Sequence, residues 1–410
     1  MKKGQYGLPG RAFEQQSRLI RDTARGNFHR HEWAIAAAMV ACVIAGCAEP
    51  RPPRLVCEPR AGHALRQRFC VVYSGQYQIN LGGLEKLHPF DINKYSRIYQ
   101  RLVADGLIRA EDVWVPSEIA REDLLQVHTE QYLDDLRRPA KLAGYLESGF
   151  VSLLSAKDCD AGILRPFRYA TGGTLLAARL ALQYGMAVNI GGGYHHAEPD
   201  RGGGFCIYAD MPIAIRVLQH EGRIKRALVV DLDVHQGNGT AVCLQGDDDV
   251  FTFDMHEEDI YPFPKEHNDL DVSLPRGIRD AEYLDLLSHN LGEVFEKAAP
   301  DVVFLQAGAD VLQGDPLAHL RLSPDAIVQR DGMVFAEADH RHVPIVMALG
   351  GGYSRNAWYV QYRSIRRLIE QYGAEPASQP SALPVAAVTV HYPQLDCADF
   401  RPDNAPGSPG

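Results

Sequence analysis

Short apolar runs alternate with longer amphipathic stretches between about residues 70 and 372, and this alternation is the feature that most constrains the fold. The apolar runs predict strands at Cys70–Tyr73, Ala187–Ile190, Ala227–Leu232, Val250–Asp254, Asp301–Gln306 and Pro344–Leu349. The amphipathic stretches predict helices that include Asn93–Asp105, Gly172–Gln183, Met211–His220, Ala281–Ala298 and Ser323–Ala338. Buried strands that alternate with helices indicate an α/β fold with a parallel, doubly wound sheet. Ligands bind such a sheet beyond the carboxyl ends of its strands.

Both ends of the chain differ from this central body, which we predict to be one domain over residues 70–372. Residues 1–69 predict a leader or tether, in which a basic segment precedes the apolar stretch Ala34–Gly46 and then Cys47. This layout is typical of a bacterial lipoprotein signal, with a lipid anchor at Cys47 and a place in the cell envelope. The alternative is an unstructured or wrongly assigned leader on a cytoplasmic protein. Residues 373–410 predict a Pro-rich tail with one further strand at Val385–Val390.

Charge and cysteine placement exclude several classes of function. The chain carries a formal net charge of −10, and residues 1–70 are net basic whereas the rest of the chain is net acidic. An acidic main body disfavours direct binding of nucleic acid, because phosphate recognition needs clustered cations. The 8 cysteines are scattered without a Cys-x-x-Cys pair. A zinc ribbon and a dense disulfide framework are therefore not expected.

The segment Asp231-Leu232-Asp233-Val234-His235 lies at a predicted strand end. Residues two apart in an extended chain point to the same side, so Asp233 and His235 face one point, as two ligands of one metal would. Asp310 follows another predicted strand through a turn of small residues. Together the three residues form a set that leaves a position open for water and substrate, which is typical of a catalytic zinc site. The alternative is an acidic strand end that caps a helix.

Further polar residues follow the other predicted strands. His195 and His196 come after three glycines, and a histidine pair can supply the base and the acid that amide hydrolysis needs. Asp231 and Asn238 are candidate partners for the second ring nitrogens. Tyr353 also follows three glycines, and its phenol could donate to a developing oxyanion or simply pack a loop.

A glycine-rich segment follows the histidine pair and ends in Gly204 and Phe205. One interpretation is a phosphate loop, but the Gly-Lys-Ser/Thr sequence of such loops is missing. A glycine wall that admits an extended side chain, with Phe205 stacked against it, fits this segment better.

Taken together, these motifs resemble those of the histone deacetylase superfamily of zinc amidohydrolases. The resemblance rests on Gly-Gly-Gly-Tyr-His-His at 191–196, Arg-Gly-Gly-Gly-Phe-Cys at 201–206, Asp-Leu-Asp-Val-His-Gln-Gly-Asn-Gly at 231–239, Ala-Gly-Ala-Asp at 307–310 and Gly-Gly-Gly-Tyr at 350–353. The segments 83–91, 164–168 and 171–174 are similar to the class IV branch. The resemblance covers about residues 70–372 and implies the arginase/deacetylase fold, with a parallel sheet of about eight strands.

The resemblance also implies roles for individual residues. One Zn²⁺ per chain would be held by Asp233, His235 and Asp310, while His195 and His196 would form the catalytic dyad, with His196 the main acid and base. Tyr353 would be the oxyanion donor, and Gly204 and Phe205 would line the acyl tunnel. A structural K⁺ would be bound by Asp231, by main-chain oxygens of Asp233 and His235, and by the Asp254-Met255 segment. Two departures matter, because Asp254 stands where class I members usually carry Ser, and Asn238 replaces their Asp.

The leading functional hypothesis is zinc-dependent removal of acyl groups, acetyl or longer, from acyl-lysine in proteins. A second hypothesis is a small-molecule amidohydrolase that acts on acyl-amines such as acetylated polyamines. A third, from a different class, is a non-catalytic module that binds acyl-lysine. We expect one metal rather than the pair of an arginase, because Gly237 and Leu312 stand where further bridging carboxylates would be needed.

Overall fold

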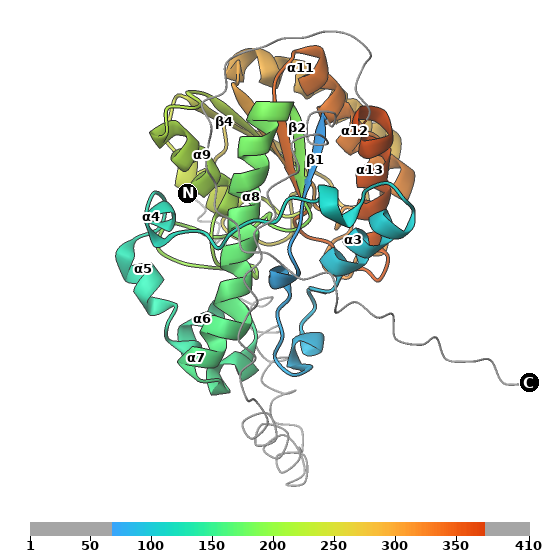
Figure 1. The fold of residues 1–410 in the computed structure, drawn as a ribbon. Helices are drawn as coiled ribbons and strands as arrows, with labels where there is room; N and C mark the ends of the chain where they lie inside the picture. Colours follow the sequence, from blue (N-terminus) through green and yellow to red (C-terminus); the bar gives the residue numbers. More distant parts are fainter. Residues whose placement is uncertain (1–67, 374–410) are drawn as a thin grey trace, which may run out of the picture. The chain divides into compact units, whose positions relative to one another are not determined.

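The computed structural model describes residues 68–373, which build a wholly parallel sheet flanked by helices (Figure 1). The strands are β1 (Phe69–Val72), β2 (Met186–Asn189), β3 (Ala227–Asp231), β4 (Val250–Glu257), β5 (Leu270–Leu274), β6 (Val302–Gln306) and β7 (Ile345–Ala348). Their order across the sheet is β1-β2-β7-β6-β3-β4-β5. This α/β architecture confirms the predicted fold class, with 7 strands in the described part of the chain where about eight were expected.

Helices cover both faces of this sheet. The α-helices are α3 (Lys94–Ala104), α4 (Arg121–Leu124), α5 (Glu130–Asp135), α6 (Pro139–Tyr145), α7 (Ala156–Cys159), α8 (Arg165–Tyr184), α9 (Asp210–His220), α10 (Asn238–Leu244), α11 (Asp280–Ala298), α12 (Pro324–His340) and α13 (Ala357–Tyr372). Shorter turns are η2 (Gly75–Tyr77), η3 (Leu84–Leu87), η4 (Ala110–Asp112), η5 (Gly149–Leu153) and the π-turn η6 (Asp160–Leu164). Helix α8 crosses the front of the sheet in Figure 1, whereas α11, α12 and α13 lie on the opposite side. None of the helices in residues 68–373 is long and apolar enough to span a membrane.

The central strands form the core and fix the position of the site. Every residue of β2, β3, β6 and β7 is buried, as expected for a parallel sheet covered on both faces. The registers pair Asp231 at the end of β3 with Gln306 at the end of β6, and Gln306 with Ala348 at the end of β7. The carboxyl ends of these neighbouring strands therefore share one edge of the sheet, and the loops that follow them start close together.

The predicted strands match the observed ones to within a few residues at each end. Strand β5 was missed because its sequence is short and mostly half-exposed, as suits an edge strand. Helix α8 begins earlier than predicted, at Arg165. Pro166 lies in its first turn, where the backbone N–H that proline lacks would have no partner within the helix. Helix α13 and the short helices between residues 121 and 164 were not predicted. The predicted leader with Cys47 and the predicted strand Val385–Val390 lie outside the described residues.

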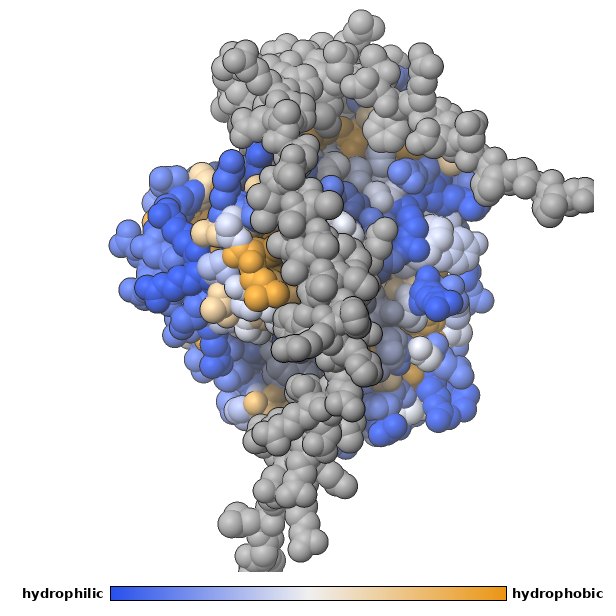
Figure 2. Space-filling model, turned by 90° about the horizontal axis from the view of Figure 1, so that it is seen from below, coloured by the Kyte–Doolittle hydropathy of each residue, from blue (hydrophilic) through white to orange (hydrophobic). Residues whose placement is uncertain are grey.

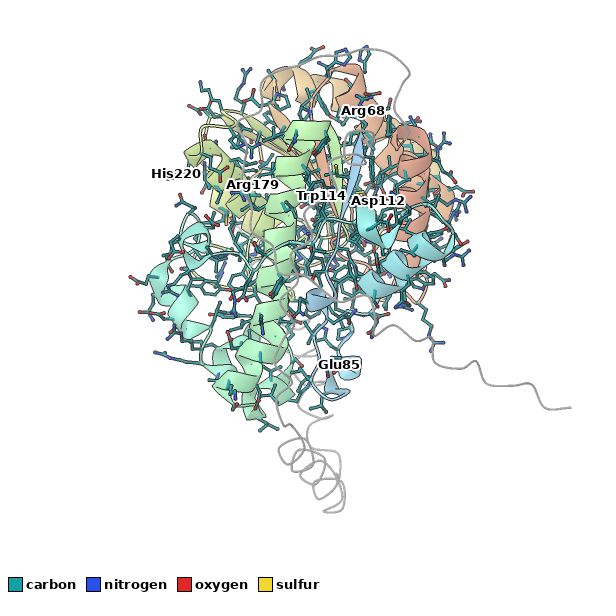
Figure 3. All side chains as sticks on the ribbon, in the orientation of Figure 1. Arg68, Glu85, Asp112, Trp114, Arg179 and His220 are labelled. Carbon is teal, nitrogen blue, oxygen red and sulfur yellow. The ribbon has the colours of Figure 1, made fainter. Side chains whose placement is uncertain are left out.

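The surface of the described domain carries both hydrophilic and hydrophobic side chains. Seen from below, hydrophilic groups surround a small gathering of hydrophobic groups near the middle of the face (Figure 2). Trp114 extends the sheet beyond β1, because its backbone amide donates to the Val71 carbonyl at 2.9 Å (Figure 3). Glu85 lies well below the strands, on the segment before α3, which contributes to the cavity described below (Figure 3).

Candidate active site

Loops that follow four neighbouring strands bring the predicted site residues together. The loop after β2 carries His195 and His196, and the segment after β3 carries Asp233 and His235. The loops after β6 and β7 carry Asp310 and the turn 350–353. These strands are adjacent in the sheet order, so the four loops meet above its middle.

Asp233, His235 and Asp310 form a compact set of metal-type donors. One ligand atom from each lies within 4.8 Å of the others. The His235 Nδ1 atom lies 3.3 Å from Asp233 Oδ1 and 3.3 Å from Asp310 Oδ2. Two carboxylates and one imidazole that converge in this way fit a divalent transition metal such as zinc.

The surroundings of this set hold the two carboxylates in place. All three side chains are buried, and backbone amides of Gly351 and Val234 donate to Asp233 Oδ2 and Asp310 Oδ1 at 2.8 and 3.0 Å. A Cβ atom at Gly351 would lie 2.1 Å from Asp310 Oδ2, so only glycine permits this approach. Buried carboxylates this close together repel each other, and a cation between them would offset that cost.

The histidine pair lies beside this set, and each ring has a different partner. The rings of His195 and His196 are 4.0 Å apart, and that of His196 is 5.9 Å from the His235 ring. The His195 Nδ1 atom lies 2.8 Å from Asp231 Oδ2, whereas the His196 Nδ1 atom lies 2.7 Å from Asn238 Oδ1. The two partners considered from the sequence thus serve one ring each.

A buried acid behind Asn238 determines which atom of its amide meets His196. The Asn238 Nδ2 group donates to Glu198 Oε1 at 2.9 Å, so the Oδ1 atom is left to accept from His196. His196 Nδ1 therefore carries the proton, and its Nε2 atom has a free lone pair. Arg201 in turn donates to Glu198 at 2.8 Å.

The electrostatic surroundings separate the two rings. Burial alone would lower the pKa of His195, but the carboxylates of Asp231 and Asp233 raise this pKa to about 9. Burial, followed by the neighbouring His195 and His235, holds the pKa of His196 well below its ordinary value. A protonated ring thus lies next to a neutral ring that can accept a proton.

Tyr353 completes the ring of polar groups around the metal-type set. Its ring meets that of His235 edge to face at 6.2 Å. Its backbone amide donates to Asp315 Oδ2 at 2.8 Å, which fixes the end of the glycine turn. Loss of hydration raises the pKa of its phenol well above the ordinary value, so the hydroxyl keeps its proton and can donate.

The glycine turn is also held from behind by Lys94. This lysine is fully buried, and its Nζ atom donates to the carbonyls of Gly350 and Gly351 at 2.7 and 3.1 Å. Its ammonium lies 4.5 Å from the ring centre of Phe90. Burial lowers the pKa of Lys94 to about 8, despite the nearby carboxylates of Asp310 and Asp233. A buried cation therefore supports the turn that carries Tyr353.

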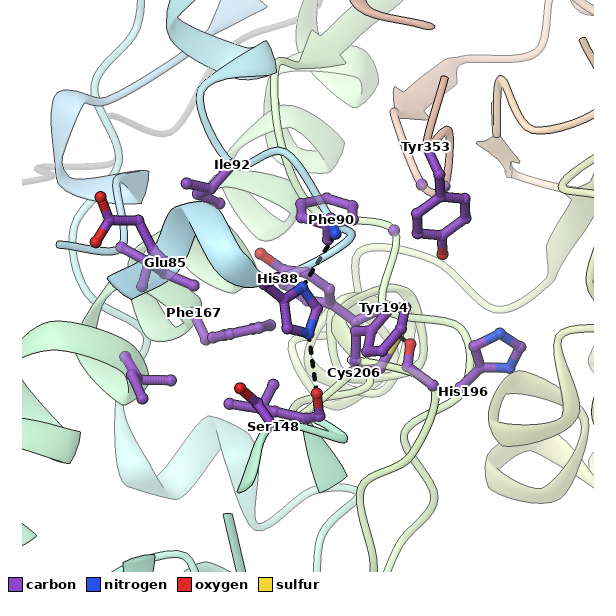
Figure 4. Close-up of a pocket in the computed structure, with 18 of the residues that line it drawn as sticks. Glu85, His88, Phe90, Ile92, Ser148, Phe167, Tyr194, His196, Cys206 and Tyr353 are labelled. Carbon is purple, nitrogen blue, oxygen red and sulfur yellow. Dashed lines mark hydrogen bonds between the residues drawn. The ribbon is translucent and has the colours of Figure 1, made fainter. Parts of the chain in front are cut away.

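A cavity of about 800 Å³, counted to its open mouth, extends from these polar groups (Figure 4). His196 and Tyr353 lie at one side of it, and Phe167, Ile92 and Glu85 lie at the other (Figure 4). Its lining is mostly apolar and comes from segments 79–95, 146–167, 192–196, 204–206 and 350–353. Gly204 and Phe205, the predicted tunnel residues, are part of this lining.

Four residues of the site were missed from the sequence. Tyr261, in the loop after β4, places its ring 4.9 Å from that of His196, and its Cε1 lies 3.0 Å from a Cβ built on Gly204. Lys94, Glu198 and His88 act through hydrogen bonds to groups distant in sequence. His88 lay in the segment 83–91 that resembles the class IV branch, and Lys94 lay in a predicted helix, but no local pattern marked the role of either.

The residues expected to bind potassium lie next to the metal-type set. Asp231 and Asp254 are paired in the register of β3 and β4, and both are buried. Asp254 Oδ1 lies 2.7 Å from His256 Nδ1, and its Oδ2 accepts from the Gly237 amide at 2.8 Å. Asp254, His256 and Asp271 also form the second group of metal-type donors found within residues 68–373. Asp254 thus already has two protein partners, as has Asp231, whose oxygens meet His195 and the Asp233 amide.

Comparisons with known proteins identify relatives of this chain. The histone deacetylase domain profile matches residues 88–367. "Histone deacetylase 2" of Arabidopsis thaliana is 40% identical over 307 residues, which cover 74% of this chain and 79% of that protein. "Acetoin utilization protein AcuC" of Bacillus subtilis is 29% identical over 329 residues, which cover 75% and 83%.

Among solved structures, that of the HDA15 HD domain matches with a TM-score of 0.60 and 21% identity. The match covers 73% of this chain and 90% of that one, and it shows a shared fold. The domain profile and the plant relative together show, from the sequence, the family of this chain. This chain belongs to the histone deacetylase family of hydrolases.

Proposed function

We propose that the protein is a zinc-dependent hydrolase that removes acetyl or longer acyl groups from acyl-lysine side chains of proteins. One observation carries the proposal: a buried set of metal-type donors lies next to His196 and Tyr353, which line one side of a largely apolar cavity. The names of the relatives support a deacetylase in general. The choice of zinc and of acyl-lysine is our own inference.

Asp233, His235 and Asp310 would hold the zinc ion. Zinc supplies a Lewis acid that polarises the acyl carbonyl and activates a water molecule. The protein's own part in the water step falls to His196, whose free Nε2 atom can take a proton from the water and later give it to the departing amine. Asn238 and Glu198 keep His196 in the tautomer that this step needs.

Tyr353 and His195 would stabilise charge during the reaction. The Tyr353 hydroxyl can donate to the oxygen on which negative charge develops. Its glycine turn is already anchored by Lys94 and Asp315, so little reorganisation is needed. His195, paired with Asp231, would place a positive charge beside the reacting groups without leaving its hydrogen bond.

The shape of the cavity favours an extended acyl-amine. Tyr261 lies against the ring of His196, and Phe205 lies in the cavity lining 6.0 Å from the ring of Tyr353. These aromatic surfaces suit the alkyl stem of lysine. Beyond the polar groups the apolar lining continues to Val151, Ile163 and Phe167. A chain longer than acetyl would bury further CH₂ groups there, each worth about 0.8 kcal/mol.

A screen of the metal-replete protein tests this proposal. The substrates are lysine peptides with acyl chains from acetyl to tetradecanoyl, and acetylated polyamines. We expect hydrolysis of the peptides with a preference set by chain length. Faster hydrolysis of the polyamines would replace the proposal by the small-molecule alternative, and binding without hydrolysis would leave the non-catalytic module.

We also propose a K⁺ ion beside the zinc, held by Asp231, by the main-chain oxygens of Asp233 and His235, and by the Asp254-Met255 segment. The pair of buried carboxylates, Asp231 and Asp254, supports this proposal, because a cation would reduce their repulsion. Replacing K⁺ by choline in the buffer should lower activity or melting temperature. Unchanged values for both would exclude the ion.

Lipid attachment at Cys47 is a further proposal, and it rests on the sequence of the leader. Expression of the full chain in a bacterium should give protein in the membrane fraction, and Cys47→Ser should release it. A full chain that stays in the soluble fraction with its leader intact would contradict this anchor.

A further inference from the structure

We propose that His88 is a positioning residue that holds two walls of the cavity together and thereby limits the length of the acyl chain that enters. This inference rests on the proposed function and deepens it. His88 lies in the middle of the cavity, between His196 and Tyr353 on one side and Phe167 and Ile92 on the other (Figure 4).

Both nitrogen atoms of the His88 ring are bound to backbone groups. The Nδ1 atom accepts from the Phe90 amide at 3.1 Å, and the Nε2 atom lies 2.9 Å from the Leu146 carbonyl oxygen. An amide can only donate and a carbonyl can only accept, so the ring must be neutral with its proton on Nε2. Burial lowers the pKa of His88, more than Glu147 and the backbone groups raise it, which agrees with a neutral ring.

One of these hydrogen bonds is local, whereas the other joins two segments that are distant in sequence. The bond to Phe90 shapes the turn that leads to Ile92 and α3, which forms one wall of the cavity. The bond to Leu146 holds the start of the loop that contains Phe150 and Val151, which forms another wall. His88 thus connects the two walls and fixes their separation, and in this sense we call it a strut.

The ring of His88 also contacts Phe205, one of the predicted tunnel residues. The rings of His88 and Phe205 are 4.5 Å apart at an angle of 80°, and Phe205 in turn lies 6.0 Å from Tyr353. Phe205 has a φ of 66°, a left-handed conformation that costs energy for a residue with a Cβ. His88 therefore abuts a strained residue and confines the passage between the polar groups and the distal apolar end.

Substitution of His88 tests this role by its effect on chain-length preference. The quantity measured is the ratio of kcat/KM for dodecanoyl-lysine to kcat/KM for acetyl-lysine. His88→Ala removes the ring and both hydrogen bonds, and should raise this ratio about tenfold or more, because a few CH₂ groups of accessible pocket are worth that much. His88→Phe keeps a ring but loses both bonds, and should raise the ratio in the same direction.

The control is His340→Ala, which removes an exposed histidine at the end of α12 and should leave the ratio unchanged. A wild-type ratio in His88→Ala would overturn the proposal. A wild-type ratio in His88→Phe would show that ring volume alone limits the chain, and would overturn the strut.

Calorimetric binding of free dodecanoate and acetate to the metal-free protein separates this inference from the proposed function. If the wild type hydrolyses no acyl-lysine, the proposed function fails. The proposed role of His88 in limiting chain length is still supported if His88→Ala binds dodecanoate at least several-fold more tightly than the wild type, with no gain in acetate affinity. Equal affinities in wild type and variant would overturn it.

Discussion

The two sides of the cavity are built in different ways. On the strand-end side, side chains that follow β2, β3, β6 and β7 carry the polar groups, and most of these have a buried hydrogen-bond partner. On the loop side, segments 79–92 and 146–167 supply a mostly apolar wall from short helices, turns and the first turn of α8. The sheet fixes the atoms of the strand-end side, whereas the loop side is held by a few bonds such as those of His88. Chemistry should therefore depend on the first side and chain-length selection on the second.

The largest effect is expected for His196→Ala on the strand-end side. General acid–base catalysis contributes about 10²–10⁴ in rate, so turnover should fall by that factor. His195→Ala should lower turnover less, because the proposed base, Nε2 of His196, is retained. Turnover is measured on acetyl-lysine peptides, with a melting curve as the control for folding. Near-normal turnover in His196→Ala would remove it from the proposed role.

Tyr353→Phe should have the next largest effect. It removes one hydroxyl and almost no volume, and loss of one oxyanion donor costs about 10²–10³ in kcat. KM should change little. If kcat stays unchanged and only KM rises, Tyr353 belongs with the apolar lining rather than with the polar groups.

Lys94→Met tests whether the glycine turn needs its buried cation. Loss of a hydrogen bond from a charged group costs about 1.5–3 kcal/mol, so kcat should fall about tenfold or more if the turn relaxes. The pKa of Lys94 is lowered to about 8, so wild-type kcat should decline as the pH rises through that value and the ammonium loses its proton. That decline should be absent from Lys94→Met. An identical pH profile in both proteins would show that Lys94 does not support Tyr353.

Ile163→Trp should have the smallest effect on the chemistry and sharpens the contrast between the two sides. Ile163 is buried in the distal lining, and the indole ring of the introduced Trp would fill space in the cavity there. Overpacking costs about 1–3 kcal/mol of stability, and acetyl-lysine hydrolysis should stay close to wild type. Hydrolysis of dodecanoyl-lysine should fall strongly. An equal loss for both substrates would mean that the two sides are not separable.

The same contrast explains what the sequence could and could not predict. The strand-end motifs were found because buried strands end in glycine and polar residues, and because Asp233 and His235 are two apart in an extended segment. Partners on the loop side depend on contacts between distant segments, such as that of His88 with Leu146, and leave no periodic signal. Lys94 was placed in a predicted helix, but an amphipathic pattern does not show that its charged end is buried under Tyr353.

A single metal held by Asp233, His235 and Asp310 is central to the proposed reaction, and a metal titration tests it most directly. The chelator-washed protein is titrated with Zn²⁺, and turnover on an acyl-lysine peptide is recorded at each step. Gly237 and Leu312 offer no side-chain ligands, so a second ion would lack bridging carboxylates. We predict that activity rises linearly and stops at about one equivalent per chain. A requirement for two equivalents, or full activity without metal, would contradict the account.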